Sequence, residues 1–262
     1  MSANRQSPGL RFNIWLLKFT RNWLRVALFL LGLYIALPFT APTLMKLGVT
    51  GPARAIYFLY SPFCHQFAFR SFFLFGEQPV YPRANTGSDW QSFESYALES
   101  PEFLGHYRYW YTSVTGQPIQ AITYDELAEF TPWLQFAARE FRGNEQMGYK
   151  VTLCERDIFI YTAMFVGGLG YARVRRRLRP VPFWLYLLLG IVPIGLDGFS
   201  QLLGYPPFAF WPPRETLPVF RVVTGALFGF MNVWLGFPYM EQSMAETRQQ
   251  ITDKLTRAGI HI

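Results

Sequence analysis

The stretch SPFCHQFAFRS at residues 61–71 decides how this chain is interpreted, together with the shorter stretch TLCERD at residues 152–157. Each stretch holds one of the two cysteines of the sequence, Cys64 and Cys154. The first also holds His65, one of three histidines. We predict that the fold brings these two distant segments to one polar patch.

Both stretches have the pattern of a helix start. Ser61 is a favourable N-cap residue, and Pro62 suits the first helical position. Thr152 followed three residues later by Glu155 has the spacing of a capping box. We therefore predict a helix over 62–75 and another that begins after Thr152. Each cysteine would then lie near a helix N-terminus, where the helix dipole favours a thiolate.

The composition is that of a membrane protein. The 262 residues are 51% hydrophobic, 19% aromatic and 16% charged, whereas about 25% of an average soluble domain is charged. The apolar residues form blocks long enough, or nearly so, to cross a bilayer. The sequence predicts an all-α integral membrane protein with four transmembrane helices, at 26–47, 158–172, 183–205 and 218–239.

The predicted helix at 62–75 is too short to be a fifth span. Its 14 residues extend about 21 Å, less than the ~30 Å of a bilayer core. If it crossed, the arginine-rich loop at 173–179 would face outward, against the positive-inside bias. We expect this helix to lie in the outer interface or to re-enter the membrane.

The positive charges predict the orientation. Five basic residues precede the first span, and five arginines lie at 173–179, between the second and third spans. Because both groups adjoin apolar spans, we assign them to cytoplasmic anchoring and exclude nucleic acid as a partner. The sequence thus predicts a multi-pass plasma-membrane protein with cytoplasmic N- and C-termini.

The chain divides into five predicted segments. Within the polar insert, helices are expected at 125–141 and around 90–98, but not a confident independent core. The segments are a cytoplasmic basic lead at 1–25, the first span and interfacial helix at 26–76, a polar extracytoplasmic insert at 77–151, a three-helix transmembrane region at 152–239 and a cytoplasmic amphipathic tail at 240–262.

The last predicted span has a helix-packing face. Arg221, Gly225 and Gly229 are spaced four residues apart, so they share one side of a helix. Small residues at this spacing let two helix backbones approach closely. We expect another span to pack there, with Arg221 at the outer end of the contact.

Several polar residues are expected in one layer at the outer membrane boundary. Asp197 and Gln201 share a helix face, and an ionisable residue at membrane depth usually faces a partner or a wet cavity. Asp197 is therefore the first candidate for a functional residue. The alternative is a structural ion pair with Arg221 or Arg70. The arginines, Arg156 among them, could also extend to lipid headgroups.

Three kinds of chemistry remain open for the cysteines. Cys64 and Cys154 could form a structural disulfide outside the cytoplasm. Cys64, His65, Cys154 and Asp157 together would make a zinc-type ligand set. Alternatively, Cys64 could be a nucleophilic or redox thiol.

The order of the polar motifs resembles an uncharacterised prokaryotic family of membrane proteins, domain of unknown function 2085. The similar motifs are CHQ at 64–66, RS at 70–71, CxR at 154–156, GLDGFxQ at 195–201 and RxxTG at 221–225. The resemblance covers about 55–76 and 150–235, and the long stretch 77–150 departs from it. It implies no established activity. It implies a shared polar site formed by Cys64, His65, Gln66, Arg70, Cys154, Arg156, Asp197, Gln201 and Arg221.

Two functional hypotheses follow. In the first, a metal-dependent or thiol-based site binds or transforms a lipid-like or quinone-like molecule at the outer leaflet, with zinc as the expected metal. In the second, the protein is a non-catalytic accessory or assembly subunit that docks partner membrane subunits through the insert 77–151, with the cysteines as a disulfide. The candidate catalytic residues of the first hypothesis are Cys64, Arg70, Arg156, Asp197, Gln201 and Arg221.

Overall fold

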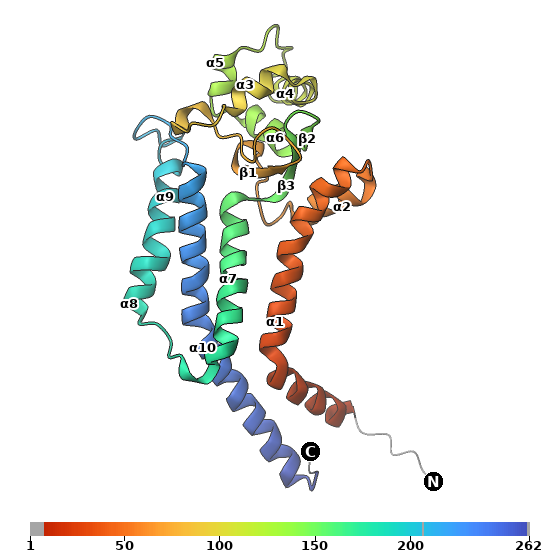
Figure 1. The fold of residues 1–262 in the computed structure, drawn as a ribbon, viewed down its shortest axis with the longest axis vertical. Helices are drawn as coiled ribbons and strands as arrows, with labels where there is room; N and C mark the ends of the chain where they lie inside the picture. Colours follow the sequence, from red (N-terminus) through yellow and green to blue (C-terminus); the bar gives the residue numbers. More distant parts are fainter. Residues whose placement is uncertain (1–7, 206, 261–262) are drawn as a thin grey trace.

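Residues 8–205 and 207–260 are described here from a computed structural model of the protein. Its long helices form an elongated bundle with a cap at one end (Figure 1). The start of α1 and the end of α10 lie at the opposite end from the cap. The α-helices are α1 Pro8–Lys46, α2 Thr50–Tyr60, α3 Phe93–Glu99, α4 Pro101–Thr115, α5 Tyr124–Ala128, α6 Pro132–Glu140, α7 Glu155–Val174, α8 Phe183–Tyr186, α9 Val192–Leu202 and α10 Pro218–Arg257.

Three helical stretches in the described residues are long and apolar enough to cross a membrane: α1, Phe183–Leu202 and α10. The second runs from α8 through a π-helical turn at Leu187–Ile191 into α9. The fourth predicted span, 158–172, lies in α7, which is not one of the three. α7 nevertheless packs between α1 and α10, as the ribbon shows (Figure 1).

The predicted glycine face of the last span is where α10 contacts α7. A Cβ atom at Gly229 would lie 2.2 Å from the carbonyl oxygen of Ile160. A Cβ atom at Gly225 would lie 2.6 Å from the carbonyl oxygen of Arg156. Both separations are well inside van der Waals contact, so only glycine permits this approach of the two backbones.

Gly229→Ala is therefore expected to destabilise the protein by about 1–3 kcal/mol, the usual cost of overpacking a close contact. Gly236→Ala on the same helix is the matched control, because no heavy atom lies within 4 Å of its added Cβ. Denaturation of the purified protein in detergent would measure both. Equal stability of the two variants would contradict the packing assigned to Gly229.

The cap contains a sheet, which the all-α prediction did not include. β1 Ser71–Leu74, β3 Gly148–Cys154 and β2 Gly143–Asn144 pair antiparallel in the order β1-β3-β2. Ser71 lies opposite Cys154 in this ladder. Strand pairing therefore joins the two cysteine-bearing segments, and the protein is mostly but not wholly helical.

The predicted helix at 62–75 is wrong. Ser61 is the C-cap of α2, not an N-cap, and its hydroxyl donates to the carbonyl oxygen of Phe58 at 2.8 Å. Pro62 follows, as proline often does just after a helix end. An irregular stretch then leads through a 3₁₀ turn at Ala68–Arg70 into β1, whose aromatic residues suit a strand.

The predicted helix at 125–141 is divided into α5 and α6. Thr131 caps α6, since its hydroxyl oxygen accepts the N–H of Leu134 at 3.3 Å, and Pro132 occupies the first turn. The helix expected around 90–98 begins later, at Phe93. The final helix α10 is longer than the predicted span and includes most of the expected tail.

The cap has its own hydrophobic core, which includes part of the cysteine segment. Phe93, Phe103 and Phe141 from the insert are almost fully buried, as is Phe69 from the segment after Cys64. The insert and that segment therefore form one packing unit. This unit holds the first cysteine in place against the outer end of the bundle.

Candidate functional site

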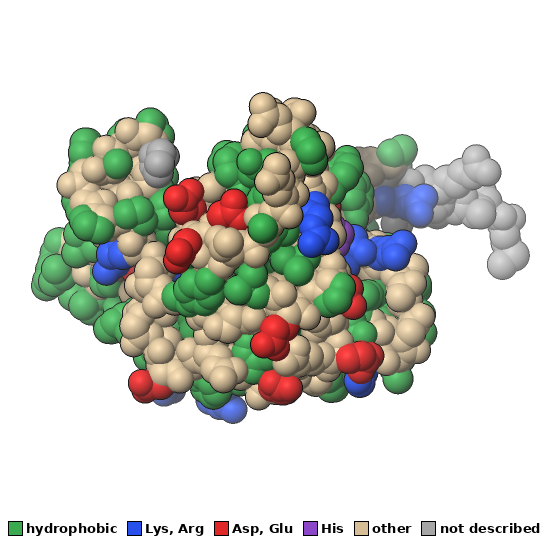
Figure 2. Space-filling view, turned by 90° about the horizontal axis from the view of Figure 1, so that it is seen from above, with side chains coloured by type: hydrophobic (Ala, Val, Ile, Leu, Met, Phe, Trp, Pro, Cys, Tyr) green, Lys and Arg blue, Asp and Glu red, His purple; other side chains and the backbone are tan. Residues whose placement is uncertain are grey.

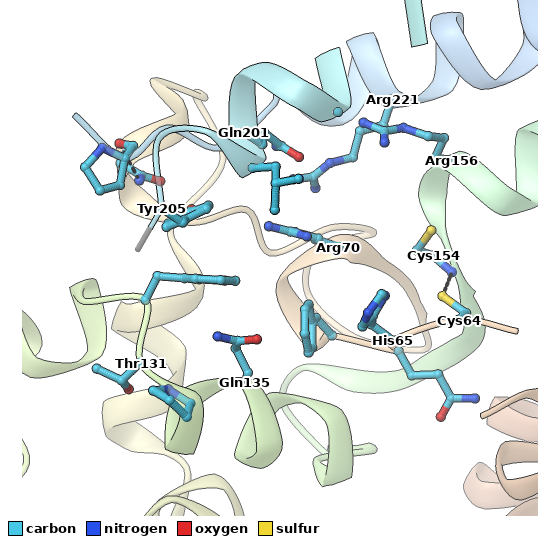
Figure 3. Close-up of a pocket in the computed structure, with 18 of the residues that line it drawn as sticks. Cys64, His65, Arg70, Thr131, Gln135, Cys154, Arg156, Gln201, Tyr205 and Arg221 are labelled. Atoms are coloured by element: carbon cyan, nitrogen blue, oxygen red, sulfur yellow. Dashed lines mark hydrogen bonds between the residues drawn. The ribbon is translucent and has the colours of Figure 1, made fainter. Parts of the chain in front are cut away.

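A cavity of about 1010 Å³ lies where the cap meets α7, α9 and α10. Figure 3 shows the two cysteines on one side of it, Arg70 near its middle, and Gln201 and Tyr205 on the opposite side. The sequence placed these residues in one layer, and the structure brings most of them to one cavity. The predicted site residues that line it are Cys64, His65, Gln66, Arg70, Cys154, Arg156, Asp157, Gln201 and Arg221.

The cysteine side of the cavity is a compact group of three possible ligand atoms. The sulfur atoms of Cys64 and Cys154 and a carboxylate oxygen of Asp157 all lie within 4.8 Å of one another. The backbone N–H of Cys154 donates to the Cys64 sulfur at 3.2 Å. Both thiols are free, and the pairing of Ser71 with Cys154 in the β1–β3 ladder brings the two cysteine-bearing segments together.

His65 lines the cavity but does not belong to this group of three. Its side chain is exposed and its ring lies 5.4 Å from that of Phe67. Three of the four predicted zinc ligands therefore converge in the described residues. The fourth points from the same loop into the cavity (Figure 3).

Cys154 does not have the acidic thiol that a helix N-terminus was expected to give. Its hydrogen bond with Cys64 and its burial raise the pKa of this thiol well above the ordinary value, and the negative charge of Asp157 raises it further. The surroundings of this thiol therefore favour its protonated form, the opposite of what a helix N-terminus alone would favour.

Lys150 supports the loop that carries Cys64. Its ammonium group is buried and donates to the carbonyl oxygens of Gln66 at 2.7 Å, Ala138 at 3.0 Å and Arg139 at 2.6 Å. Burial, with help from nearby Arg142, lowers the pKa of this lysine well below its ordinary value. Lys150 thus ties the loop to α6.

Gln66, the third residue of the CHQ motif, is buried and structural. Its side-chain amide donates to the carbonyl oxygen of Tyr57 at 2.9 Å, and its φ of 56° lies in the left-handed region. This conformation turns the chain between Cys64 and the 3₁₀ turn. Gln66 shapes the loop, while its two neighbours in the motif face the cavity.

The opposite side of the cavity is organised by Glu215, which the sequence did not single out. Arg70 donates to this carboxylate through Nε at 3.0 Å and through a second guanidinium nitrogen. Arg221 also donates to it, as does the hydroxyl of Tyr205 at 2.8 Å and the amide of Gln201 at 3.3 Å. Glu215 therefore joins the cap to α9 and α10.

The charge of Glu215 is stabilised although the side chain is buried. Burial alone would raise the pKa of its carboxyl group, but the positive charges of Arg70 and Arg221 more than offset this and lower it. Arg70 also lies 5.5 Å from the ring centres of Phe67 and Phe130. Such cation–π contacts hold the guanidinium group between the cap and the cavity.

Asp197 is not paired with Arg221 or Arg70, as the structural alternative expected. It forms an ion pair with Arg156 and accepts hydrogen bonds from the Thr216 hydroxyl and, at 3.4 Å, from Arg214. The carboxylate therefore lies just behind the cavity wall and orients Arg156. The Nε–H of Arg156 is buried and has no hydrogen-bond partner in the described residues.

The contacts of two carboxylates, Glu155 and Glu215, were missed from the sequence. Glu155, assigned only to a helix cap, accepts from Arg221 at 3.2 Å, so the Arg221 side chain is buried rather than extended to lipid. Glu215 is the single acidic residue of the proline-rich stretch 206–217. The sequence places Arg214 and Arg221 near Glu215, but nothing local identifies Arg70 as its partner.

Comparison with known proteins supports the resemblance for the second half of the site. Residues 139–235 match the family described as "Predicted membrane protein (DUF2085)". The matched range contains Cys154, Arg156, Asp197 and Arg221, whereas the CHQ motif at 64–66 lies outside it.

An uncharacterized protein of Methanocaldococcus jannaschii is 30% identical over 92 residues, which cover 35% of this chain and 54% of the relative. The match thus spans about half the length of that relative. No solved structure matches the chain. Residues 139–235, with the α7–α10 half of the cavity, are therefore similar to a family of predicted membrane proteins whose description gives no activity.

Proposed function

We propose that the protein binds a lipid-like or quinone-like molecule in the cavity between cap and bundle, at the outer boundary of the plasma membrane. The volume of about 1010 Å³ is at the upper end of the usual range for small-molecule sites. The observation that carries the proposal is the Arg156 guanidinium group, which is 20% exposed and whose Nε–H has no partner in the described part of the chain, in a cavity wall that also contains Phe63, Phe130 and Leu202. A polar head with an apolar tail complements this combination.

Charge supports the proposed orientation. The insert 77–151 has ten acidic and five basic residues, and acidic side chains are spread over the cap in Figure 2. The stretches 8–25 and 173–179, at the other end of the bundle, contain basic residues and no acidic ones. The positive-inside bias then places the cap outside and both termini in the cytoplasm.

In this orientation α7 is the fourth span, and α2 takes the role given to the interfacial helix. α2 has 11 residues, or about 16 Å, too few to cross the bilayer. Its side chains Phe58 and Leu59 are 80% and 56% exposed, and so is Phe63 just beyond it at 65%. These apolar groups suit the outer leaflet beside the cavity mouth.

A zinc ion at the cysteine side of the cavity is part of the proposal. Two sulfur atoms and a carboxylate oxygen within 4.8 Å of one another need to move by only about 1 Å to share a tetrahedral ion, since Zn–S bonds are about 2.3 Å. His65 or an atom of the bound molecule would supply the fourth ligand. When bound, zinc would polarise an oxygen of the ligand's head group.

Replacing Arg156 tests the binding site. Arg156→Gln is expected to weaken binding of a short-chain ubiquinone by tenfold or more, since a hydrogen bond from a charged donor contributes roughly 1.5–3 kcal/mol. Asp197 would keep Thr216 and Arg214 as partners, which favours retention of the fold. Binding to the detergent-solubilised protein can be followed by the quenching of its tryptophan fluorescence.

Arg108→Gln is the control, because Arg108 is exposed on α4, away from the cavity. The control should bind as the wild type does, and the thermal denaturation of both variants shows whether they are folded. Unchanged binding by a folded Arg156→Gln variant would contradict the proposal.

The accessory-subunit hypothesis remains the second candidate. The cap exposes several aromatic side chains, among them Trp90 at 46%, Tyr109 at 63% and Phe136 at 39%. Aromatic residues of this kind are enriched at protein interfaces. Isolation of the native membrane complex in mild detergent distinguishes the two functions, since a dedicated subunit would co-purify with a fixed proportion of partner and without a small molecule in the cavity.

A further inference from the structure

A second, smaller cavity lies at the end of the bundle away from the cap, between α1 and the end of α7. Its volume is about 300 Å³. It is separate from the cap cavity and contributes nothing to the function proposed above. Its polar lining consists of Arg21, Asn22, Arg25 and Arg175, and its apolar lining includes Leu24 and Leu28.

This smaller cavity, called the notch below, is lined within residues 8–205 and 207–260 by three arginines and by no acidic residue. Arg175 is paired with Glu241 at 2.7 Å. Arg21 and Arg25 form no ion pair with any carboxylate in the described residues; Arg25 instead donates to the side-chain oxygen of Asn22 at 3.3 Å. Glu241, the carboxylate that contacts this part of α1, already accepts from the indole N–H of Trp23 at 2.8 Å and from Arg175, and α1 itself contains no acidic residue. An anion therefore complements the notch.

The same helix face continues as an apolar stripe toward the membrane centre. Arg21, Arg25, Phe29 and Leu33 follow one another at intervals of four residues on α1, so they lie along one side of it. Phe29 is 69% exposed and Leu33 is 46% exposed. Charge at the helix end and uncovered apolar side chains above it match a molecule with an anionic head and a long hydrocarbon tail.

We propose that this notch binds the phosphate-bearing headgroup of an anionic phospholipid, with an acyl chain along Phe29 and Leu33. Basic pockets between transmembrane helices on the cytoplasmic side commonly bind such headgroups. A soluble phosphate compound would use the two arginines but leave the apolar stripe uncovered. The lipid occupant is therefore favoured over a free phosphate.

The test compares wild type with the double variant Arg21→Gln, Arg25→Gln in the full-length protein. Each basic residue near an anionic surface contributes about 1 kcal/mol, so the double variant should bind phosphatidylglycerol on the order of 30-fold more weakly. Native mass spectrometry measures the lipid retained at increasing phosphatidylglycerol concentration. The matched control is Lys254→Gln, Arg257→Gln, which removes two exposed charges at the same end of the bundle.

We expect wild type and control to retain phosphatidylglycerol in preference to phosphatidylcholine, and the double variant to lose this preference while it denatures at a similar temperature. Equal retention by the double variant, or an equal loss in the control, would overturn the proposal. A thermal stabilisation by millimolar inorganic phosphate as large as that by the lipid would also overturn it, because the apolar stripe would then have no part in binding.

Discussion

Replacing Glu215 by glutamine is expected to lower the free energy of unfolding by about 3–5 kcal/mol, the usual effect of removing one partner from a buried ion pair. The side chain of Glu215 is fully buried, and the side chain of its partner Arg221 is only 3% exposed. The change leaves two guanidinium groups, those of Arg221 and Arg70, without this carboxylate. Glutamine has nearly the same shape, so the loss reports the charge.

The expected effect is large because Glu215 joins three parts of the molecule. Arg70 belongs to the cap, Arg221 to α10, and Tyr205 and Gln201 to the end of α9 and the loop after it. Loss of the carboxylate therefore removes the contact with Arg221 and also weakens the attachment of the cap to the helix bundle. We expect the cap to become susceptible to proteases in Glu215→Gln before the bundle unfolds.

The dependence of stability on pH in acid gives a second test of Glu215. The folded pKa of Glu215 is lowered relative to about 4.3 in an unfolded chain. Its stabilising contribution is therefore present above about pH 4.3 and is lost as the pH falls toward the lower folded value. The wild type should lose stability over this window more steeply than Glu215→Gln, which has no carboxylate to protonate.

Glu145→Gln is the matched control, because Glu145 also pairs with a basic residue, Lys46, but at the surface. The two side chains are 79% and 41% exposed, and exposed ion pairs contribute little to stability. The control should denature close to wild type. If Glu215→Gln does so too, the buried carboxylate does not hold the cap to the bundle.

The sequence predicts the parts of this fold that depend on local pattern. Apolar blocks predict four spans, and three of these correspond to helices long and apolar enough to cross a membrane, while the spacing of Gly225 and Gly229 identifies the close α7–α10 contact. The convergence of Cys64 with Cys154 could be expected because polar groups near a membrane boundary tend to share one layer. Each of these signals is contained in a short stretch of chain.

The missed features depend on partners far away in the sequence. Residues 71–74 form a strand only because β3, about 75 residues later, pairs with them, so a local helix-start pattern at Ser61 was misleading. Glu215 acquires its role from Arg70, which is 145 residues away. No local pattern contains that information, since tertiary pairing decides it.

Cys154→Ser is expected to lower the zinc affinity of the protein by at least about 100-fold. Loss of a group that only orients a zinc ligand already costs 10–100-fold, and Cys154 would be a direct ligand. Its sulfur, the Cys64 sulfur and a carboxylate oxygen of Asp157 lie within 4.8 Å of one another. Elemental analysis of the purified protein and competition with a zinc chelator would give the stoichiometry and the affinity.

The variant set separates a metal site from the other two cysteine chemistries. Asp253→Asn is the control, because Asp253 is an exposed carboxylate near the end of α10 and its loss should leave zinc binding unchanged. Asp157→Asn should retain zinc more weakly than wild type, since an amide oxygen is a poorer ligand than a carboxylate. A wild type with two free thiols but no zinc would contradict the metal site and favour thiol chemistry. A wild type with neither zinc nor free thiols would favour the disulfide, because closure of that bond consumes both sulfur ligands at once.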